Sequence, residues 1–193
     1  MKTHYLKINP EKFESSQLIP AADILTGGGL VAFPTETVYG LGAVVDHEAA
    51  LQNIFQVKGR PGDNPLILHI WHHRQLSDIA ETVDPRYQKL IDAFWPGPLT
   101  LIFPKKANIS PTVTAGLPTV AVRMPSHPVA RELLRLVDRP VAAPSANLSG
   151  RPSPTRGEHV REDLDGKIPM IIDAGPCQAG IESTVLLLAE KPY

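Results

Sequence analysis

The sequence predicts a single α/β domain, residues 1–193, built on a mixed β-sheet. Short apolar runs alternate along the chain with segments of helical spacing, which is the order typical of α/β proteins. Several connections are too short to cross over between parallel strands, so antiparallel neighbours are also expected. The length of 193 residues suits one compact domain, and 42% apolar with 20% charged residues is ordinary for a chain that buries a core.

The first elements have clear end signals. Apolar residues at helical spacing over 16–25 predict a helix that Gly27, Gly28 and Gly29 terminate. A buried strand is expected over 30–33, where Pro34 ends it.

The next helices have recognisable N-terminal signals. Asp46 is the expected N-cap of a helix over 48–57. Asp84 and Pro85 begin a helix that runs to Phe94. Ser126 is expected to cap a helix that ends near Val137. A polar helix is expected over 156–164. The remaining strands are expected at residues 66–70, 99–103, 120–123, 141–143, 170–173 and 184–188.

Composition excludes several classes of protein. Cys177 is the only cysteine, so an internal disulfide and a cysteine-based metal site are excluded, and a buried, inert thiol is expected. The net charge of −1 argues against a strongly basic nucleic-acid binder. No signal-peptide core and no run of transmembrane length occurs, which predicts a cytoplasmic protein without membrane contact.

Small polar and cationic residues cluster in loops that follow predicted strands and one helix. These segments are residues 34–40, 58–64, 123–125, 144–150 and 180–184. If they meet at one edge of the sheet, they form a crevice rich in hydroxyl and amide donors, with Lys58, Arg60 and Arg123 as fixed cations. Such a set, without a nucleophile–base pair, suits an anionic ligand such as a phosphate chain or a carboxylate.

Each feature also has a structural explanation. Lys58 and Arg60 follow a helix, where the helix dipole favours cations. Ser145 and Asn147 can hydrogen-bond within a turn. Arg123 is the more indicative residue, because it follows an alternating strand with no obvious partner nearby.

The histidines do not indicate a metal centre. His72 and His73 are adjacent, so their side chains do not converge in a helix or strand, and no carboxylate spacing supports them. His69 ends an apolar run and is interpreted as a semi-buried group that orients a ligand. No Walker A sequence and no G-x-G-x-x-G before a helix occurs, which excludes ordinary ATPase and Rossmann folds.

Taken together, these segments resemble the YrdC-type threonylcarbamoyl-AMP synthases. The resemblance is carried, in the order of the family, by PTETVYGLG (34–42), KGRP-x-x-NPL-x-x-H (58–69), WPGPLT (95–100), VAVRMP-x-HP (120–128), PVAAPSAN-x-SG (140–150), SPT (153–155) and G-x-ESTV (180–185). These segments cover nearly the whole chain, and an ordered set of this kind could hardly arise by chance.

The resemblance implies an L-threonylcarbamoyladenylate synthase, in which L-threonine, bicarbonate and ATP give threonylcarbamoyl-AMP and pyrophosphate. The product would pass to a tRNA threonylcarbamoyl transferase complex that modifies the adenosine next to the anticodon. It also implies the YrdC-like fold, a twisted mixed sheet with flanking helices and a deep, positive cleft. No enzyme nucleophile is required, so catalysis would depend on alignment and charge stabilisation.

The resemblance also implies roles for individual residues. L-threonine would be held by Thr37, His69, Arg123, Ala143 and Ser183, with Arg123 facing its carboxylate and Ala143 acting through its backbone. ATP would contact Arg60, Asn64, Thr119, Ser145, Asn147 and Ser153, and Lys58 and Arg60 would be the catalytic residues. Mg²⁺ would accompany the phosphates, held largely by them and by water rather than by side chains.

The sequence departs from the family at its C-terminal end. Family members generally continue into a segment with an Arg followed by Pro or Gly, which contributes to the nucleotide site, and longer members add a second domain. This sequence stops at Tyr193. A shortened chain or a less enclosed nucleotide site is therefore expected.

Two other functions remain as alternatives. A double-stranded RNA or tRNA-binding module would use a modest basic face made by Lys105, Lys106, Arg131, Arg135 and Arg139, although the near-zero net charge weighs against it. A related carbamoyl-adenylate-forming domain would use carbamoyl phosphate, but domains of that type normally accompany others.

Overall fold

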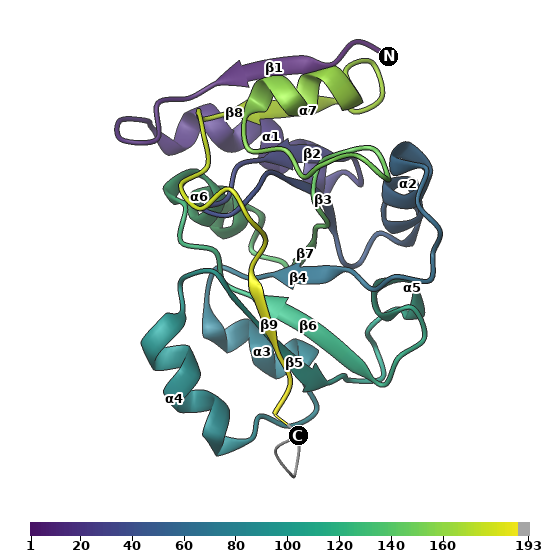
Figure 1. Cartoon of the computed structure of the whole chain (residues 1–193), viewed down its shortest axis with the longest axis vertical. Helices are drawn as coiled ribbons and strands as arrows, with labels where there is room; N and C mark the ends of the chain where they lie inside the picture. The colour runs from purple at the N-terminus through teal and green to yellow at the C-terminus, as the bar shows by residue number, and fades with distance from the viewer. Residues whose placement is uncertain (189–193) are drawn as a thin grey trace.

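The computed structural model describes residues 1–188, in which nine strands form one mixed sheet (Figure 1). Their order across the sheet is β1-β8-β2-β3-β7-β4-β6-β5-β9. The strands are β1 (His4–Lys7), β2 (Val31–Phe33), β3 (Gly40–Val44), β4 (Ile67–His69), β5 (Leu99–Pro104), β6 (Thr119–Arg123), β7 (Val141–Ala142), β8 (Met170–Asp173) and β9 (Thr184–Leu186). The C-terminal end of the sequence, where it departs from the family, lies outside the described residues.

The sheet combines both strand orientations, as the connection lengths predicted. β1 and β2 run parallel to β8, β4 runs parallel to β6, and β5 runs parallel to β9. The pairs β2–β3, β3–β7, β4–β7 and β5–β6 are antiparallel. The predicted mixed α/β class is therefore confirmed.

Helices cover both faces of the sheet. They are α1 (Ile19–Thr26), α2 (Glu48–Lys58), α3 (Leu76–Ile79), α4 (Pro85–Phe94), α5 (Pro111–Thr114), α6 (Pro128–Val137) and α7 (Gly157–Leu164), with 3₁₀ turns at Ser15–Leu18 and His73–Gln75. Val31 and Phe33 pack with α1 and α6, whereas Ala32 packs in the other core cluster with α2 and α7. Because strand side chains alternate between faces, β2 contributes to both layers.

The helix N-termini test the capping predictions. Asp84 caps α4 and accepts from a backbone N–H at 2.8 Å, as predicted. The predicted cap Asp46 is wrong, because α2 begins two residues later without a side-chain cap, and Asp46 instead pairs with Arg139 at 3.5 Å. Ser126 is also wrong: His127 caps α6, since the proline that follows it occupies the first helical position.

Two strands were not predicted. β1 is a short edge strand, half-exposed, that gives little apolar signal. β3 contains Gly40 and Gly42, residues that weaken a strand pattern and are typical of loops. Gly42 is needed here because a Cβ atom would lie 2.8 Å from Phe33 and 2.9 Å from Val141. Close packing between strands therefore explains why Gly42 is present in β3, although glycine weakens the sequence pattern of a strand.

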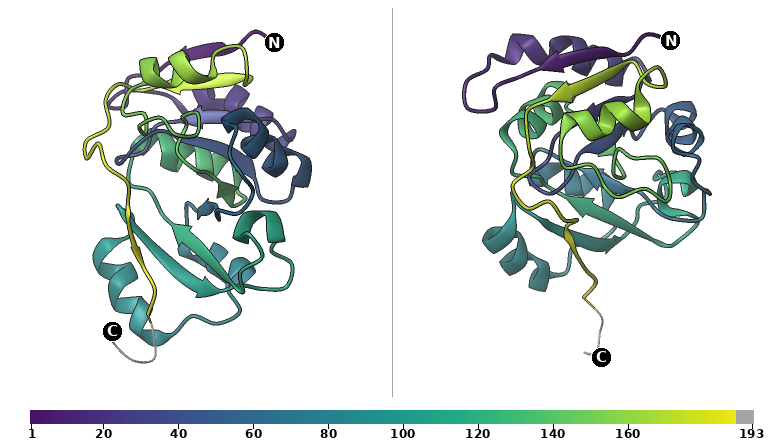
Figure 2. Two further views of the ribbon diagram at one scale, coloured as in Figure 1. Left: turned by 45° about the vertical axis from the view of Figure 1, so that its right-hand side comes forward. Right: turned by 45° about the horizontal axis from the view of Figure 1, so that its top comes forward.

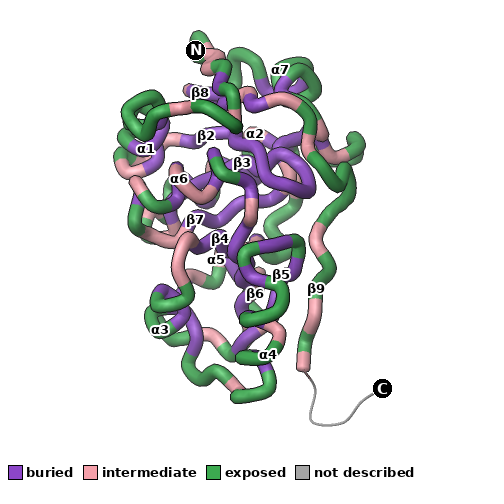
Figure 3. The backbone as a smooth tube through the Cα atoms, turned by 90° about the vertical axis from the view of Figure 1, so that its left-hand side faces the viewer, coloured by how far each residue is buried: buried purple, intermediate pink, exposed green. Residues whose placement is uncertain are grey.

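The segment after β8 connects two distant parts of the sheet. It runs along the outside of the molecule and adds β9 beside β5 at the far edge (Figures 1 and 2). Figure 3 shows this strand as exposed or half-exposed, in contrast to the buried centre of the sheet. Along residues 1–188, no helix has both the length and the apolar composition to span a membrane.

Candidate active site

A row of polar side chains crosses three neighbouring strands of the sheet. His69 on β4 is paired in register with Arg123 on β6, and Arg123 is paired with Thr100 on β5. Residues in register across strands point to the same face. Strand pairing alone therefore brings together two residues that are 54 positions apart.

Arg123 is buried, with 3% of its surface exposed, and its guanidinium has several partners. Nη2 donates to Glu36 Oε1 at 2.6 Å, and Nη1 donates to Thr37 Oγ1 at 2.8 Å. Nε donates to the carbonyl oxygen of Gly97 at 3.4 Å. The sequence shows no obvious partner near Arg123, and the structure supplies one from a loop 87 residues earlier.

Glu36 remains ionised within this network. Burial opposes its charge, but the Coulombic attraction of Arg123 and hydrogen bonds from Arg123 and Ser126 together hold the pKa of its carboxyl below the usual value. Burial and the charge of Arg123 lower the pKa of His69 to about 3, so its imidazole is neutral at physiological pH. The site therefore combines a neutral histidine with a paired cation.

A pocket of about 210 Å³ lies at this row of side chains. The predicted residues that line it are Thr37, Arg60, Asn64, His69, Arg123, Ala143, Ser145 and Ser183. Every predicted threonine-binding residue is in this set. Its volume is below the roughly 300–1,000 Å³ typical of sites for drug-sized ligands, so the pocket suits an amino acid better than a whole nucleotide.

Ser183 reaches the pocket from the long segment before β9. Its hydroxyl lies 2.7 Å from the hydroxyl of Thr100, the residue in register with Arg123. The backbone N–H of Gly180 also donates to the carbonyl of Thr37 at 3.1 Å. These two contacts, one at Gly180 and one at Ser183 itself, attach the segment to the rest of the site. The backbone N–H of Ala143 donates to Ile67, so this N–H is already used.

The side of the pocket predicted for ATP is more open. Arg60 is half-buried and Asn64 is exposed, and their one mutual contact is a 3.4 Å hydrogen bond from Arg60 Nη2 to the backbone of Asn64. Ser145 is half-buried and forms an antiparallel bridge with Gly40. These groups have donors that remain accessible to an anionic ligand.

Lys58 lies beneath this side rather than in the pocket. Its Nζ donates to the backbone oxygens of Ser145 at 2.5 Å and Asn147 at 2.6 Å, and to Asn147 Oδ1 at 3.3 Å. Burial, with a contribution from the charge of Arg60, lowers the pKa of Lys58 to about 8. The ammonium group thus fixes the 145–147 loop from below.

Three other predicted ATP contacts lie outside the lining of the pocket. Thr119 is at the opposite end of β6 from Arg123, Asn147 faces Lys58, and the Ser153 hydroxyl donates to the Glu182 carboxylate. Their contact with ATP stays a prediction, as does the catalytic role of Lys58. Glu182 lines the pocket and was not predicted.

Two buried residues of the site were also missed. Glu36 is 5% exposed, although its neighbours in sequence are small polar residues typical of a loop. Tyr39 is fully buried, and its hydroxyl donates to the backbone oxygen of Gly175 at 2.7 Å. A charged residue in a segment that ends a buried strand is a signal that could have identified Glu36 as the partner of a buried cation.

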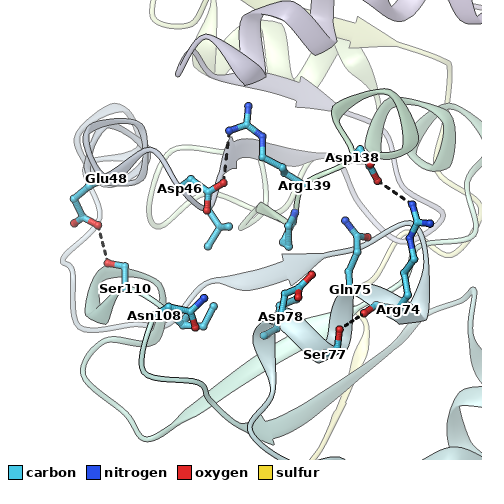
Figure 4. Close-up of a pocket in the computed structure, with 14 residues that line it drawn as sticks. Asp46, Glu48, Arg74, Gln75, Ser77, Asp78, Asn108, Ser110, Asp138 and Arg139 are labelled. Atoms are coloured by element: carbon cyan, nitrogen blue, oxygen red, sulfur yellow. Dashed lines mark hydrogen bonds and ion pairs between the residues drawn. The ribbon is translucent and has the colours of Figure 1, made fainter.

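A larger cavity of about 760 Å³ lies elsewhere, between α3, the segment that follows α6 and the start of α2 (Figure 4). Its two arginines are already paired: Arg74 contacts Asp138 at 3.4 Å, and Arg139 contacts Asp46 at 3.5 Å. None of the predicted site residues lines it. The smaller pocket, where the predicted residues converge, is therefore the candidate active site.

The residues around the site do not form a protein metal cage. Within residues 1–188, no group of three or more His, Cys, Asp or Glu side chains is placed to hold a metal ion. Among the described residues that line the pocket, Glu182 is the single carboxylate. This donor set fits a Mg²⁺ ion that is held mainly by phosphates and water. Cys177 is half-buried rather than buried as expected, and the partial burial of its thiol raises its pKa to about 11, in agreement with an inert cysteine.

Comparison with known proteins gives consistent matches. The Sua5/yciO/yrdC family model, which carries the description "Telomere recombination", matches residues 23–193. The threonylcarbamoyl-AMP synthase of Pyrococcus abyssi is 52% identical over 182 residues, which are 94% of this chain and 54% of the relative. The enzyme of the same name from Bacillus subtilis is 54% identical over 175 residues, 90% of this chain and 51% of the relative.

A solved structure matches as closely. The crystal structure of P. abyssi Sua5 complexed with L-threonine has a TM-score of 0.94 and 49% sequence identity, and the match covers 100% of this chain and 56% of that chain. The chain thus spans about half the length of the curated relatives it matches.

Proposed function

Because this chain belongs to the Sua5/YciO/YrdC family, we propose that it makes threonylcarbamoyl-AMP from L-threonine, bicarbonate and ATP. The observation that carries the proposal is the convergence of all the predicted threonine-binding residues on one pocket of about 210 Å³. Two relatives more than 50% identical carry the name of this activity, and a similar structure is described as a complex with L-threonine.

The pocket suits the carboxylate and side chain of an amino acid. Arg123 supplies a fixed cation for the carboxylate, since Arg–carboxylate pairs form two parallel hydrogen bonds. His69 stays neutral beside it, so it can orient the ligand without adding a second charge. The hydroxyls of Thr37 and Ser183 are within the same lining and can accept or donate hydrogen bonds.

The proposed reaction needs two bond-forming steps. The amine of threonine forms a C–N bond to the carbon of bicarbonate, and loss of water leaves a carbamate. A carbamate oxygen then attacks the α-phosphorus of ATP, and the bond to the departing pyrophosphate breaks. No group of the chain becomes covalently attached, so the residues act by alignment and by stabilising charge.

The open side of the pocket is where ATP would lie. Arg60 lines this side of the pocket, two residues after Lys58, and it would contact the phosphates together with Asn64 and Ser145. Mg²⁺ bound to these phosphates would neutralise part of their charge. We further propose that the reaction takes place in the cytoplasm and that the product passes to a tRNA threonylcarbamoyl transferase complex.

The test is pyrophosphate release by the purified chain with each component omitted in turn. The proposal predicts release that requires L-threonine, bicarbonate, ATP and Mg²⁺ together. Release that requires carbamoyl phosphate instead of bicarbonate and threonine would replace it with the carbamoyl-adenylate alternative. Absence of turnover with tight, salt-sensitive binding to double-stranded RNA would replace it with the RNA-binding alternative.

The RNA-binding alternative has less support from the arrangement of charges. In the expected basic face, Arg135 contacts Glu132 at 2.6 Å and Arg139 contacts Asp46 at 3.5 Å. Lys105 donates to a backbone oxygen at 3.1 Å. Cations that are already paired contribute less to phosphate binding, which supplies most nonspecific affinity for nucleic acids.

A further inference from the structure

We propose that Glu36 is a positioning residue for amino-acid binding, because it holds both the Arg123 side chain and the loop after β6 in the orientation that receives the carboxylate of L-threonine. The inference rests on the proposed function and deepens it. Glu36 itself is absent from the described residues that line the pocket, so it acts through Arg123.

The two oxygens of the Glu36 carboxylate have different partners. Oε1 accepts from Arg123 Nη2 at 2.6 Å, and Oε2 accepts from the backbone N–H of Ser126 at 3.1 Å. Ser126 follows Arg123 by three positions, at the point where the chain leaves β6 for α6. One carboxylate therefore fixes both the tip of the arginine side chain and the backbone just beyond it.

The remaining partners of Arg123 leave a defined set of donors. A guanidinium has five N–H groups. Glu36, Thr37 and Gly97 each accept one hydrogen bond, from Nη2, Nη1 and Nε respectively. Among the described residues this leaves one N–H on each terminal nitrogen, the number that a bidentate carboxylate accepts. The contacts of Glu36 and Thr37 thus determine which donors face the ligand.

Glu36 also permits the burial of Arg123. The side chains of the pair are 7% and 4% exposed, and an unpaired cation buried to this extent is strongly unfavourable. Without Glu36, the guanidinium would reach a state of lower free energy by turning toward water. The fixed orientation of the arginine is therefore a consequence of the ion pair.

A positioning role and a purely electrostatic role predict opposite effects. If Glu36 only reduced the positive charge of Arg123, its neutralisation would strengthen the attraction for a carboxylate. If Glu36 positions Arg123, the same change weakens the binding of the carboxylate, because the guanidinium loses its orientation. In addition, the oxygen atom that accepts from the Ser126 N–H is either replaced by an amide nitrogen or displaced. The variant Glu36→Gln separates these cases.

The experiment measures L-threonine binding to the full chain by isothermal titration calorimetry, together with the KM values for threonine and ATP. For Glu36→Gln we expect the Kd and KM for L-threonine to rise at least about tenfold, in line with the loss of one partner of a buried charge pair. The KM for ATP should stay within about twofold of wild type. The matched control is Glu132→Gln, which removes the exposed pair Glu132–Arg135, also 2.6 Å long, and should leave all these constants unchanged.

A double-mutant cycle shows whether Glu36 acts through Arg123. Adding Glu36→Gln to Arg123→Ala should produce no further loss of L-threonine binding, whereas an independent structural defect would add its own loss. Should Glu36→Gln fail to fold, Glu36→Asp replaces it, because it keeps the buried charge but withdraws the carboxylate by one methylene. The same weakening for L-threonine is expected.

The outcomes separate this inference from the proposed function. A wild-type chain that neither binds L-threonine nor releases pyrophosphate with it would overturn the proposed function and this inference together. Wild-type binding with an unchanged or tighter Kd in Glu36→Gln would overturn the positioning role alone. Equal increases in the KM for threonine and for ATP would also overturn it, because they indicate a general loss of structure.

Discussion

The two sides of the pocket differ in how completely their side chains are held by the protein. On the side proposed for the amino acid, Thr37, His69 and Arg123 are exposed by 0%, 4% and 3%, and each has hydrogen-bond partners within the chain. On the side proposed for the nucleotide, Asn64 is exposed and Arg60 is half-buried, with one long hydrogen bond between them. The first side is therefore preorganised, and the second is not.

This difference follows from the elements that supply the residues. His69 and Arg123 lie on paired strands, where register fixes the position of each side chain. Arg60 and Asn64 lie in the loop between α2 and β4, which has no ladder of hydrogen bonds. A preorganised subsite loses little conformational entropy when it binds a small ligand, whereas a loop must be ordered at that moment. We expect the loop to be ordered by ATP.

The largest expected effect comes from Arg123→Ala, on the preorganised side. This change removes the cation for the carboxylate and leaves Glu36 buried without its partner. We expect kcat/KM for L-threonine to fall by about 10²- to 10³-fold, and the free energy of unfolding to fall by about 3–5 kcal/mol. Pyrophosphate release and urea unfolding measure the two effects.

The control for Arg123→Ala is a removal of an exposed ion pair. Arg135→Ala breaks the Glu132–Arg135 contact on α6 and should lower the free energy of unfolding by less than about 1 kcal/mol, with kcat/KM unchanged. If Arg123→Ala also kept its stability and its use of threonine, the preorganised side would not be where the amino acid binds.

A smaller effect is expected from Arg60→Ala, on the open side. Among the described residues, the Arg60 side chain makes one hydrogen bond, of 3.4 Å, so its loss should leave the free energy of unfolding within about 0.5 kcal/mol of wild type. The KM for ATP should rise about ten- to a hundredfold, because charge-assisted contacts with phosphates are lost. The Kd for L-threonine alone should not change. A threonine Kd that changed as much as the KM for ATP would show that the two sides are not separate.

The elements with strong local patterns were predictable from the sequence. The helix from Pro85 to Phe94 was found because an Asp–Pro pair marks its start, and the structure has the same bounds. The buried strands near His69 and Arg123 were found because apolar runs end at polar residues there. β3 was not found, because its two glycines are typical of loops and one of them, Gly42, is required by close packing against Phe33, which is a tertiary effect.

The site was predictable in its members but not in its contacts. The sequence segments that resemble the family identified Thr37, Arg123 and Ser183, and all three line one pocket. The ion pair between Glu36 and Arg123 could not be read from spacing, because the two residues are 87 positions apart and meet only through the sheet. Lys58 was predicted to be a catalytic residue, and its hydrogen bonds to the 145–147 loop could not be predicted, because they depend on how α2 packs under that loop.

The smallest expected effect is a pH dependence confined to the open side. Burial and the charge of Arg60 lower the pKa of Lys58 to about 8, so its ammonium group loses a proton as the pH rises from 7.5 to 9. A neutral amine has two N–H groups for the three oxygen atoms of Ser145 and Asn147 that now accept from it. The 145–147 loop is then held less firmly and the local positive charge is lost, so we expect the Kd for ATP to increase about two- to fivefold.

Titration calorimetry with ATP alone measures this change in Kd without interference from the amine of threonine. In Lys58→Met, which has no proton to lose, ATP binding should be weaker at every pH and should not vary between pH 7.5 and 9. If Lys58→Met kept the wild-type pH profile, the change in Kd would belong to the titration of another group. ATP binding on the open side would then not depend on the charge of Lys58.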